Sequence, residues 1–385
     1  MKIIFLSYSD TIGGACSVSF QIFKSLKKKL KFVKFFSIHK KKYDTIKINS
    51  LFYINLLKIL EKIILLFFQK KYHQSLNIFR TYNNKIINRY KPDILNLHWF
   101  QRSSISLNEI LNLKCKIIFS MHDMWMVSGT QHYFEKNDIN NFLEKNLYEI
   151  KKKIAKKPNV FFVVHNKWME SIAKKKLSIK KEKIFLCNYY PINKKIFKKL
   201  KKDYLRKKFN ISNQSKVILF SAYNVDDERK GVKYFREIIE YFKNNNSYYF
   251  ITVGNQNLKL GNKTYDNYQH FKFSEPRKLA EIYSLSDLYV CTSLLDNLPL
   301  TILESMSCGT PVLSFNNGGA KEILKKNGFI ANRRNSRLLI DIIKNIKQKD
   351  LIVKSRRSIK FAQKYFSKEK VSERYKEIFC RVISK

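Results

Sequence analysis

The sequence is poor in glycine, proline and acidic residues. Among 385 residues there are 10 glycines, 6 prolines and 30 Asp and Glu, against 76 Lys and Arg. So little glycine and proline leaves no Pro/Gly-rich linker to mark a domain boundary. The length excludes a peptide hormone or a single small binding module and predicts two or three domains. A hydrophobic fraction of 44% excludes wholesale disorder.

The six cysteines are scattered, without a C-x-x-C pair or a cluster with histidine. The sequence therefore predicts neither a zinc site nor a disulfide framework, and it favours a reducing compartment. No run of 18 residues is free of charge, so we expect no transmembrane helix. Residues 1–9 lack the cleavage site of a signal peptide and are interpreted as a buried strand. We expect a cytoplasmic protein.

The formal net charge is +46, and both halves of the chain are basic. Such a charge favours nucleic acid, an anionic membrane surface or phosphate-bearing substrates as partners. A general drift of composition toward Lys and Asn would give the same charge without any polyanionic partner, and this alternative stays open. The chain lacks a helix-turn-helix, zinc-finger or RNP-like pattern, so we expect no nucleic acid partner. A nucleic-acid-binding or polyanion-binding protein is the alternative function from another class.

Short apolar runs alternate with longer amphipathic, lysine-rich stretches. This alternation is typical of strand–helix–strand units in a mostly parallel sheet. It predicts strands at 2–7, 33–38, 94–98, 116–120, 160–164, 184–187, 217–221, 249–253, 288–292 and 311–314. The basic run 194–208 interrupts the pattern, so we place one α/β domain at 1–200 and a second at 201–365. A break near Phe366–Ser367 predicts a separate C-terminal helix at 366–385.

The densest pattern lies at 286–324. Strand 288–292 leads into a loop at its carboxyl end, where open α/β sheets place ligands. Asp296 lies in this loop, Pro299 suits the first turn of a helix, and Glu304 follows about one turn inside that helix. Taken alone, the pair suits a structural role better, with Asp296 as a cap and Glu304 in solvent. The glycine-bearing turns at 308–311 and 317–319 favour a pocket instead.

Three further features follow strands. Arg229 and Lys230 lie between strand 217–221 and the next helix, where they suit a diphosphate clamp, although one such pair in so basic a chain carries little weight alone. Gly13–Gly14 follows the first strand and permits close backbone approach to a ligand, with a plain turn as the alternative. His122 follows strand 116–120, and a hydrogen-bonded structural role is its alternative.

These residues resemble glycosyltransferase family 4, the retaining nucleotide-sugar enzymes with the GT-B fold of two Rossmann-like domains facing across a cleft. In the family signature an acidic residue is followed by seven residues, Glu and a helix ending in Cys-Gly-Thr-Pro-Val. The stretch DNLPLTILESMSCGTPV matches it, with Asp296 in place of the commoner Glu. The stretch HDMWMVSGTQHY, which begins at His122, resembles a branch that builds bacterial surface polysaccharides.

The resemblance implies the roles of the site residues. Glu304 would bind the ribose hydroxyls, and Asp296 would face hydroxyls of the donor sugar. The backbone amides of Leu300 and Thr301 would bind the diphosphate. Lys230, with Arg229, would neutralise the leaving diphosphate, while Gly13 and Gly14 would close on the donor phosphate and the acceptor. His122 would belong to the catalytic set, and residues 366–385 would cross back to the first domain.

The sequence thus predicts a retaining glycosyltransferase that needs no metal or other cofactor. It would move a hexose from a nucleotide sugar to a glycan or lipid-linked acceptor in the synthesis of capsule, O-antigen or lipooligosaccharide. A nucleotide-sugar epimerase of the same fold is a further alternative. Residues 51–69 form an amphipathic helix, which we interpret as packing on the core. Its alternative role is to hold the enzyme on an anionic membrane at the inner face of the plasma membrane.

Overall fold

The computed structural model describes residues 1–70, 72–135, 139–224, 227–258, 260, 265–272 and 275–385. The chain folds as two compact units. The first contains Met1–Pro191 together with Lys368–Lys385, and the second contains Ile192–Ser367.

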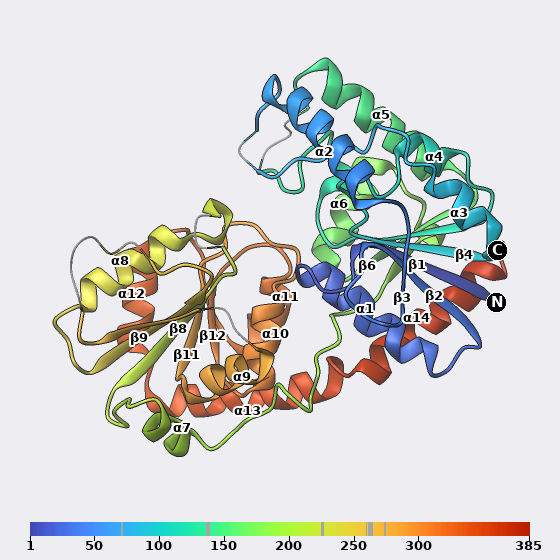
Figure 1. Ribbon diagram of the computed structural model, residues 1–385. Coiled ribbons are helices and arrows are strands. Elements are labelled where there is room, and N and C mark those ends of the chain that lie inside the picture. The colour runs from blue at the N-terminus through green and yellow to red at the C-terminus, as the bar shows by residue number, and fades with distance from the viewer. Residues whose placement is uncertain (71, 136–138, 225–226, 259, 261–264, 273–274) are drawn as a thin grey trace. The chain divides into compact units, whose positions relative to one another are not determined.

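The first unit is built on a parallel sheet with the order β3-β2-β1-β4-β5-β6-β7 (Figure 1). Its strands are β1 (Lys2–Ser9), β2 (Phe32–His39), β3 (Thr45–Lys47), β4 (Ile94–His98), β5 (Lys116–Ser120), β6 (Val160–Val164) and β7 (Ile184–Leu186). Its helices are α1 (Gly14–Lys27), α2 (Leu51–Leu66), α3 (Asn83–Arg89), α4 (Leu107–Leu111), α5 (Phe142–Lys156), α6 (Lys167–Leu177) and α14 (Lys368–Ile383). The central strands are buried on both faces, because helices cover a parallel sheet from both sides.

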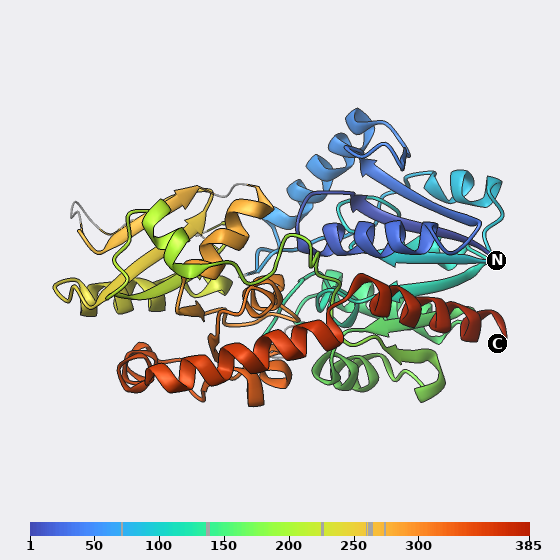
Figure 2. The same cartoon turned by 90° about the horizontal axis from the view of Figure 1, so that it is seen from below.

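The C-terminal helix α14 completes the first unit. It lies beside α1 in both views (Figures 1 and 2). The Phe379 ring packs edge-on against Phe5 of β1 at 6.1 Å, and the Tyr375 hydroxyl donates to Ser120 Oγ at 3.1 Å. The predicted return of this helix to the first domain is therefore confirmed.

The second unit repeats the architecture with the strand order β10-β9-β8-β11-β12-β13. Its strands are β8 (Lys216–Ser221), β9 (Tyr248–Gly254), β10 (Tyr268–Lys272), β11 (Leu288–Cys291), β12 (Val312–Phe315) and β13 (Phe329–Ala331). Its helices are α7 (Lys202–Lys208), α8 (Val232–Phe242), α9 (Pro276–Leu285), α10 (Leu300–Ser307), α11 (Ala320–Asn327), α12 (Ser336–Asn345) and α13 (Gln348–Tyr365). The predicted α/β class with two parallel sheets is confirmed.

Both sheets reverse their strand order at the first strand. The reversal lies between β1 and β4 in the first unit and between β8 and β11 in the second. Ligands of open α/β sheets bind outside the carboxyl ends of the strands at such a reversal. The two topologies therefore direct attention to the loops that follow β1, β4, β8 and β11.

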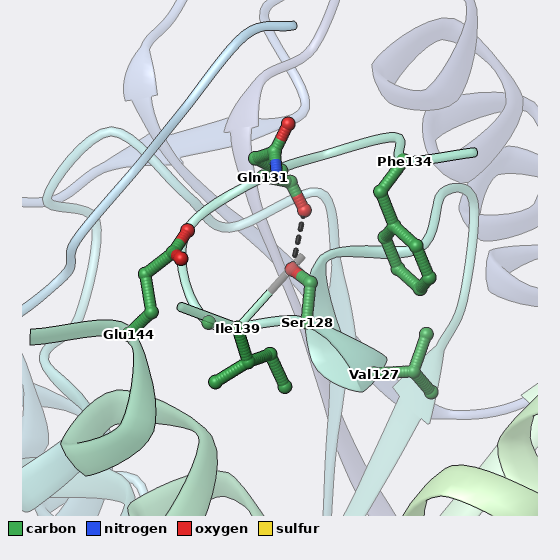
Figure 3. Close-up of a pocket in the computed structure, with 7 residues that line it drawn as sticks. Val127, Ser128, Gln131, Phe134, Ile139 and Glu144 are labelled. Carbon is green, nitrogen blue, oxygen red and sulfur yellow. Dashed lines mark hydrogen bonds between the residues drawn. The ribbon is translucent and has the colours of Figure 1, made fainter. Parts of the chain in front are cut away.

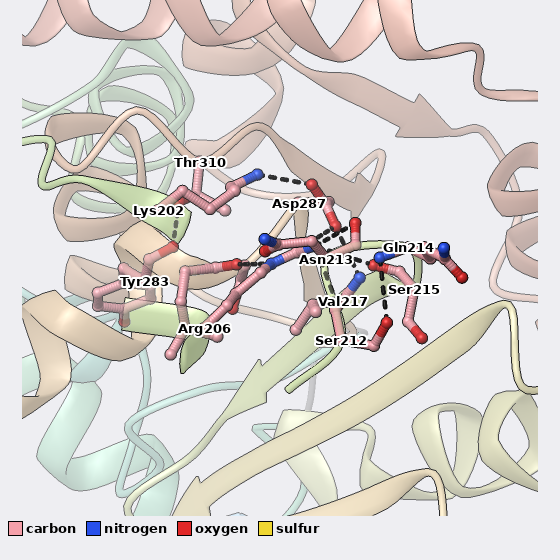
Figure 4. A network of polar contacts seen from close by, with 12 residues as sticks. Lys202, Arg206, Ser212, Asn213, Gln214, Ser215, Val217, Tyr283, Asp287 and Thr310 are labelled. Atoms are coloured by element: carbon pink, nitrogen blue, oxygen red, sulfur yellow. Dashed lines mark hydrogen bonds and ion pairs between the residues drawn. The ribbon is translucent and has the colours of Figure 1, made fainter. Parts of the chain in front are cut away.

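A buried ion pair lies at the amino ends of the strands in the second sheet, opposite their carboxyl ends (Figure 4). Asp287, immediately before β11, accepts from Arg206 at 2.5 Å, from Lys202 at 2.6 Å and from the backbone N–H of Val217 at 2.7 Å. Arg206 also donates to backbone carbonyls of the connection that leads into β8. This network fixes α7 to the amino ends of β8 and β11. It is therefore structural and distant from the carboxyl ends of the strands, where ligands are expected.

The structure moves the boundary between the units to Pro191 and Ile192, ahead of the position after residue 200 that the sequence suggested. The reason lies in the packing of the segment between them. Phe197 packs on the Tyr283 ring at 6.4 Å, and the Lys198 carbonyl accepts from Ser284 Oγ at 3.3 Å. These contacts tie the basic run to the second unit.

Helix α2 packs on the first unit with one side only. It buries Ile54, Leu57 and Glu61, while the opposite face, which carries Phe52 and Leu66, is exposed. The interpretation as a helix that packs on the core therefore holds for one side, because apolar residues occupy both sides of the helix and one side alone meets the unit. Within the described ranges, no helix combines the length and apolar character needed to cross a bilayer.

Candidate functional site

The loop that follows β11 is held by two glycines from neighbouring segments. Gly231 has a φ of +65°, and a Cβ there would lie 2.1 Å from the Thr292 carbonyl oxygen. Gly318 has a φ of +47°, and a Cβ there would lie 1.9 Å from the Asp296 carbonyl oxygen. Any side chain at either position would displace the loop, since real contacts of a Cβ atom are longer than this. The glycines thus set the place of Asp296.

Asp296 is the centre of an ion-pair cluster in this loop. Its Oδ2 accepts from Lys230 Nζ at 2.7 Å and from Arg229 Nη1 at 3.0 Å. Arg229 also donates to the Leu295 carbonyl at 3.1 Å and to Asp227 Oδ2 at 3.0 Å. The structure therefore brings together three of the residues that the sequence singled out.

The cations reach Asp296 because η3 (Glu228–Lys230) lies against the same loop. The Thr292 hydroxyl donates to the Lys230 carbonyl at 2.8 Å, and the Leu294 N–H donates to the Arg229 carbonyl at 2.7 Å. These bonds join the loops at the carboxyl ends of β8 and β11, where the strand order reverses. Val225 and Asp226 of the same segment lie outside the described residues.

The cluster keeps Asp296 ionised although it is 7% exposed. Burial raises the pKa of this carboxyl, but Lys230 and Arg229 outweigh burial and hold the pKa below its ordinary value. Asp296 and Asp227 balance the two cations in charge. A diphosphate entering this site would therefore compete with a carboxylate for Lys230 and Arg229.

Helix α10 begins directly after Pro299, as the sequence predicted. Leu300 and Thr301 form its first turn and are half-buried. The backbone N–H groups of a first helical turn have no carbonyl partner within the helix and favour an anion. The helix ends at Ser307, and Gly309 follows with a φ of +79°.

Glu304 lies one turn inside α10 and is half-buried. Its Oε2 accepts from the Tyr283 hydroxyl at 3.4 Å. The surrounding protein raises the pKa of Glu304 to about 8, because a carboxylate is poorly solvated there and the Tyr283 bond only partly offsets the loss. The side chain is therefore mostly neutral at pH 7 and ionises only above it; pKa values shifted in this way are common among functional carboxyls.

Strand β11 leads into the loop that carries Asp296, and its Tyr289 side chain contacts residues near Glu304. The Tyr289 hydroxyl donates to Thr301 Oγ1 at 2.8 Å, and its ring packs edge-on against Tyr283 at 5.7 Å. The sequence reasoning missed both tyrosines. The apolar pattern of α9 and β11 shows them as core residues, and no residue spacing could have revealed their hydroxyl bonds.

In the first unit, Gly13 and Gly14 lie where β1 meets α1. Gly13 is the N-cap of α1 with a φ of +83°, and no atom lies within 4 Å of a Cβ placed on it. The Ser9 hydroxyl accepts from the N–H groups of Thr11 and Ile12 at 3.1 Å each and shapes the turn. The space beside Gly13 is compatible with close approach of a ligand.

His122 belongs to a buried cluster of three histidines. Its Nε2 shares a hydrogen bond with His98 Nδ1 at 2.8 Å, and its Nδ1 shares one with the Tyr190 hydroxyl at 3.0 Å. His165 stacks on His122 at 5.3 Å. Burial, with smaller effects of the other two histidines, holds the pKa of His122 well below its ordinary value. His122 is thus neutral near pH 7 and engaged at both ring nitrogens, so it contacts a substrate only if one bond is exchanged.

Two small hollows lie in the first unit. One is lined by Trp99, Gln101, Met121, His122, Asp123 and neighbouring residues at the carboxyl ends of β4 and β5. The other lies in the loop after η1 (Trp125–Val127), beside Ser128, Phe134 and Glu144 (Figure 3). The second hollow contains none of the predicted site residues. Among the described residues, no group of three or more His, Cys, Asp or Glu side chains is placed to hold a metal ion.

The second unit contains the part of the chain that matches a known protein family. Residues 201–365 match the family model of glycosyl transferases group 1. The matched segment contains Arg229, Lys230, Asp296 and Glu304. A curated relative, spore coat protein SA of Bacillus subtilis (strain 168), is 32% identical over 74 residues, which cover 18% of this chain and 20% of that protein.

Solved structures share the fold over the whole chain. Sucrose-phosphate synthase from Thermosynechococcus elongatus superimposes with a TM-score of 0.75 at 14% identity, covering 100% of both chains. HepE from Anabaena, solved in complex with UDP and glucose, gives a TM-score of 0.70 at 14% identity and covers 99% of each chain. WaaG, a glycosyltransferase of lipopolysaccharide biosynthesis, gives 0.68 at 12% identity, covering 96% of this chain and 98% of its own. At these identities the likeness concerns the fold, which is that of GT-B glycosyltransferases.

Proposed function

We propose that this protein transfers a sugar from a nucleoside diphosphate sugar to a hydroxyl group. The observation that carries the proposal is the cluster of Lys230, Arg229 and Asp296 at the strand-order reversal of a group 1 glycosyl transferase domain. The complex of the Anabaena relative with UDP and glucose supports a donor of this class.

In the transfer, the bond between the anomeric carbon and the diphosphate oxygen breaks, and its electron pair leaves with the diphosphate. The acceptor oxygen bonds to the anomeric carbon, and its proton leaves on the diphosphate. Lys230 and Arg229 would stabilise the developing negative charge, together with the first-turn amides of Leu300 and Thr301. Glu304 would bind the ribose hydroxyls, and Asp296 those of the sugar once the diphosphate takes over its cations. Neither a metal nor another cofactor is part of this scheme.

The finer assignments rest on the resemblance of the sequence to glycosyltransferase family 4. We propose a hexose as the transferred sugar and retention of its anomeric configuration. For the acceptor we propose a glycan or a lipid-linked glycan in bacterial capsule, O-antigen or lipooligosaccharide synthesis. Gly13 and Gly14 would close on the donor phosphate and the acceptor, and His122 would belong to the catalytic set. The enzyme would work in the cytoplasm, at the inner face of the plasma membrane.

The first test is a thermal-shift screen of the protein with UDP-, GDP- and ADP-sugars. A ligand that binds only the folded protein raises its unfolding temperature, so the true donor should give the largest shift. A shift with DNA or RNA and with no nucleotide sugar would instead support the nucleic-acid-binding alternative. Conversion of the donor sugar without any acceptor would support the epimerase.

The second test uses two variants and a matched control. Lys230→Ala and Glu304→Ala should each reduce transfer at least about 100-fold, because each removes a charged contact to the donor. Lys233→Ala, on an exposed position of the next helix, should transfer like the wild type. Circular dichroism should show all three variants folded. Transfer at the wild-type rate by either site variant would refute the assignment of the site.

A further inference from the structure

Helix α2 presents a continuous apolar face to solvent. Phe52 is 82% exposed, Leu66 is 64% exposed, and Phe67, which follows the helix, is 79% exposed. We define the α2 apolar face by its exposed residues Phe52, Leu56, Ile59, Leu60, Ile63, Leu66 and Phe67. At about 100° per residue they fall within an arc of roughly 120°. A run of large exposed side chains this long marks an interaction surface, since single exposed apolar residues are the usual case.

The outward direction of this face is fixed by a buried carboxylate on the other side of the helix. Glu61 accepts from the N–H of Asn77 at 2.8 Å and of Leu76 at 3.4 Å, and from Ser103 Oγ at 3.0 Å. Ile54, two turns earlier on the same side of the helix, is fully buried. Turning the helix to hide its apolar face would strip Glu61 of three donors, so the face stays in solvent.

Cations lie beside the helix. Lys62 is exposed, and Lys58 Nζ donates to the Tyr8 hydroxyl at 2.7 Å. Tyr8 packs against His39 at 4.9 Å, and the exposed Lys41 follows two residues later. The pKa of His39 is lowered by burial and, to a smaller extent, by the nearby positive charges of Lys58, Arg102, Lys41 and Lys47.

We propose that the α2 apolar face inserts into the headgroup region of a bilayer that carries anionic lipids. The net charge of the chain indicates which partner covers this face. A second copy of a chain with a net charge of +46 would be repelled, whereas an anionic lipid surface attracts the lysines while the apolar side chains enter it. The inference adds a defined contact surface to the membrane partner of the proposed function, and a lipid-linked acceptor would be met at that surface.

Vesicle co-sedimentation tests the proposal without any donor or acceptor. The full-length protein should pellet with vesicles of phosphatidylcholine and phosphatidylglycerol, and much less with phosphatidylcholine alone. The double variant Phe52→Ser with Ile63→Ser should bind the mixed vesicles at least about tenfold more weakly, since it removes apolar area from the inserted face. The matched control, Ile352→Ser with Val353→Ser, removes two side chains that are 43% and 45% exposed on α13 and should bind like the wild type.

Three outcomes would overturn the proposal. The first is equal binding of mixed vesicles by the α2 double variant and the wild type. The second is equal binding of the wild type to vesicles with and without phosphatidylglycerol. The third is a wild-type dimer in lipid-free solution that becomes a monomer in the α2 double variant and not in the control. The thermal screen with nucleotide sugars is independent of all three. Failure of the membrane inference would leave donor binding intact, and failure of the proposed reaction would leave vesicle binding intact.

Discussion

Lys230 and Asp296 are joined by an ion pair of 2.7 Å between Nζ and Oδ2. Because Arg229 contacts the same oxygen at 3.0 Å, one carboxylate holds both cations of the site. This arrangement keeps the two positive side chains together in a place where they would otherwise repel each other. It also means that a diphosphate gains their charge only by displacing Asp296 from them.

The first prediction concerns the Asp296→Asn variant. It should bind the free nucleoside diphosphate as tightly as the wild type or up to about tenfold more tightly, since the competing carboxylate is gone. Turnover of the donor sugar should fall at least about 100-fold, because the proposed contact to the sugar would be lost. Isothermal titration and initial rates measure the two effects. Asp227→Asn is the control, since the Asp227 carboxylate contacts Arg229, while its bond to Lys230 runs between backbone atoms that the substitution keeps. Weaker diphosphate binding by Asp296→Asn would show that Asp296 positions the cations and does not compete for ligand.

The second prediction follows from Glu304, whose pKa is raised from 4.5 to about 8 in the folded protein. A carboxyl of this kind binds its proton more tightly when folded, so it stabilises the fold at low pH. That contribution is full below about 4.5 and is lost as pH rises to about 8. The free energy of unfolding of the second unit should fall over this window by on the order of 2–4 kcal/mol.

Urea unfolding followed by circular dichroism at several pH values measures the effect of Glu304. In Glu304→Gln the pH dependence over the same window should be reduced, because the glutamine does not titrate. Nucleotide affinity of the wild type should rise with pH through the same range, since the ionised carboxylate is the better acceptor for ribose hydroxyls. A pH-independent affinity would contradict the ribose role.

In the first unit, we expect the free energy of unfolding to change with pH in the opposite direction. Burial lowers the pKa of His165 from 6.5 to about 4, and its Nδ1 donates to the Cys187 carbonyl at 3.0 Å. The folded state therefore resists protonation, and its stability should be full above about 6.5 and decline as pH falls toward 4. The three tryptophans, Trp99, Trp125 and Trp168, all lie in the first unit, so their fluorescence during urea unfolding reports on it. His165→Gln should weaken the acid dependence, and an unchanged slope would assign it to other groups.

The fourth prediction uses the glycines of the loop. Gly318→Ala combines a positive φ with a Cβ 1.9 Å from the Asp296 carbonyl oxygen, so it should cost about 2–4 kcal/mol and weaken donor binding. Gly13→Ala has a positive φ but no atom within 4 Å, so it should cost less, about 1–2 kcal/mol. Chemical denaturation and nucleotide titration compare the two. Equal losses of stability would show that backbone conformation, not contact with the loop, dominates.

The sequence predicted the central strands well because buried parallel strands are nearly continuous apolar runs, as in β4, β5 and β6. It missed β3, β10 and β13, which are edge strands of three to five residues; β3 and β10 mix polar and apolar residues, and β13 has only three residues. Such strands are defined by their neighbours in the sheet. The sequence predicted the break before α14, but it gave no sign of the short connection between α12 and α13, which leaves little trace in the apolar pattern.

The site residues were predictable where a charged side chain follows the end of a strand. Asp296, Arg229 and Lys230 all follow strand ends, and a charged residue there is visible in the sequence. That the aspartate would hold both cations was not visible, because the pairing depends on two glycines that bring separate loops together. The face of α2 that meets solvent was likewise hidden, since its direction is decided by Glu61 and distant backbone donors.

The last eighteen residues have a consequence for biosynthesis. Tyr375 and Phe379 of α14 are fully buried against the first unit, where they cover the His98 and Phe5 rings. The amino-terminal half of a nascent chain therefore lacks part of its own interior until α14 has been synthesised. We expect the second unit, which is made before α14, to fold during synthesis while the first unit is still incomplete.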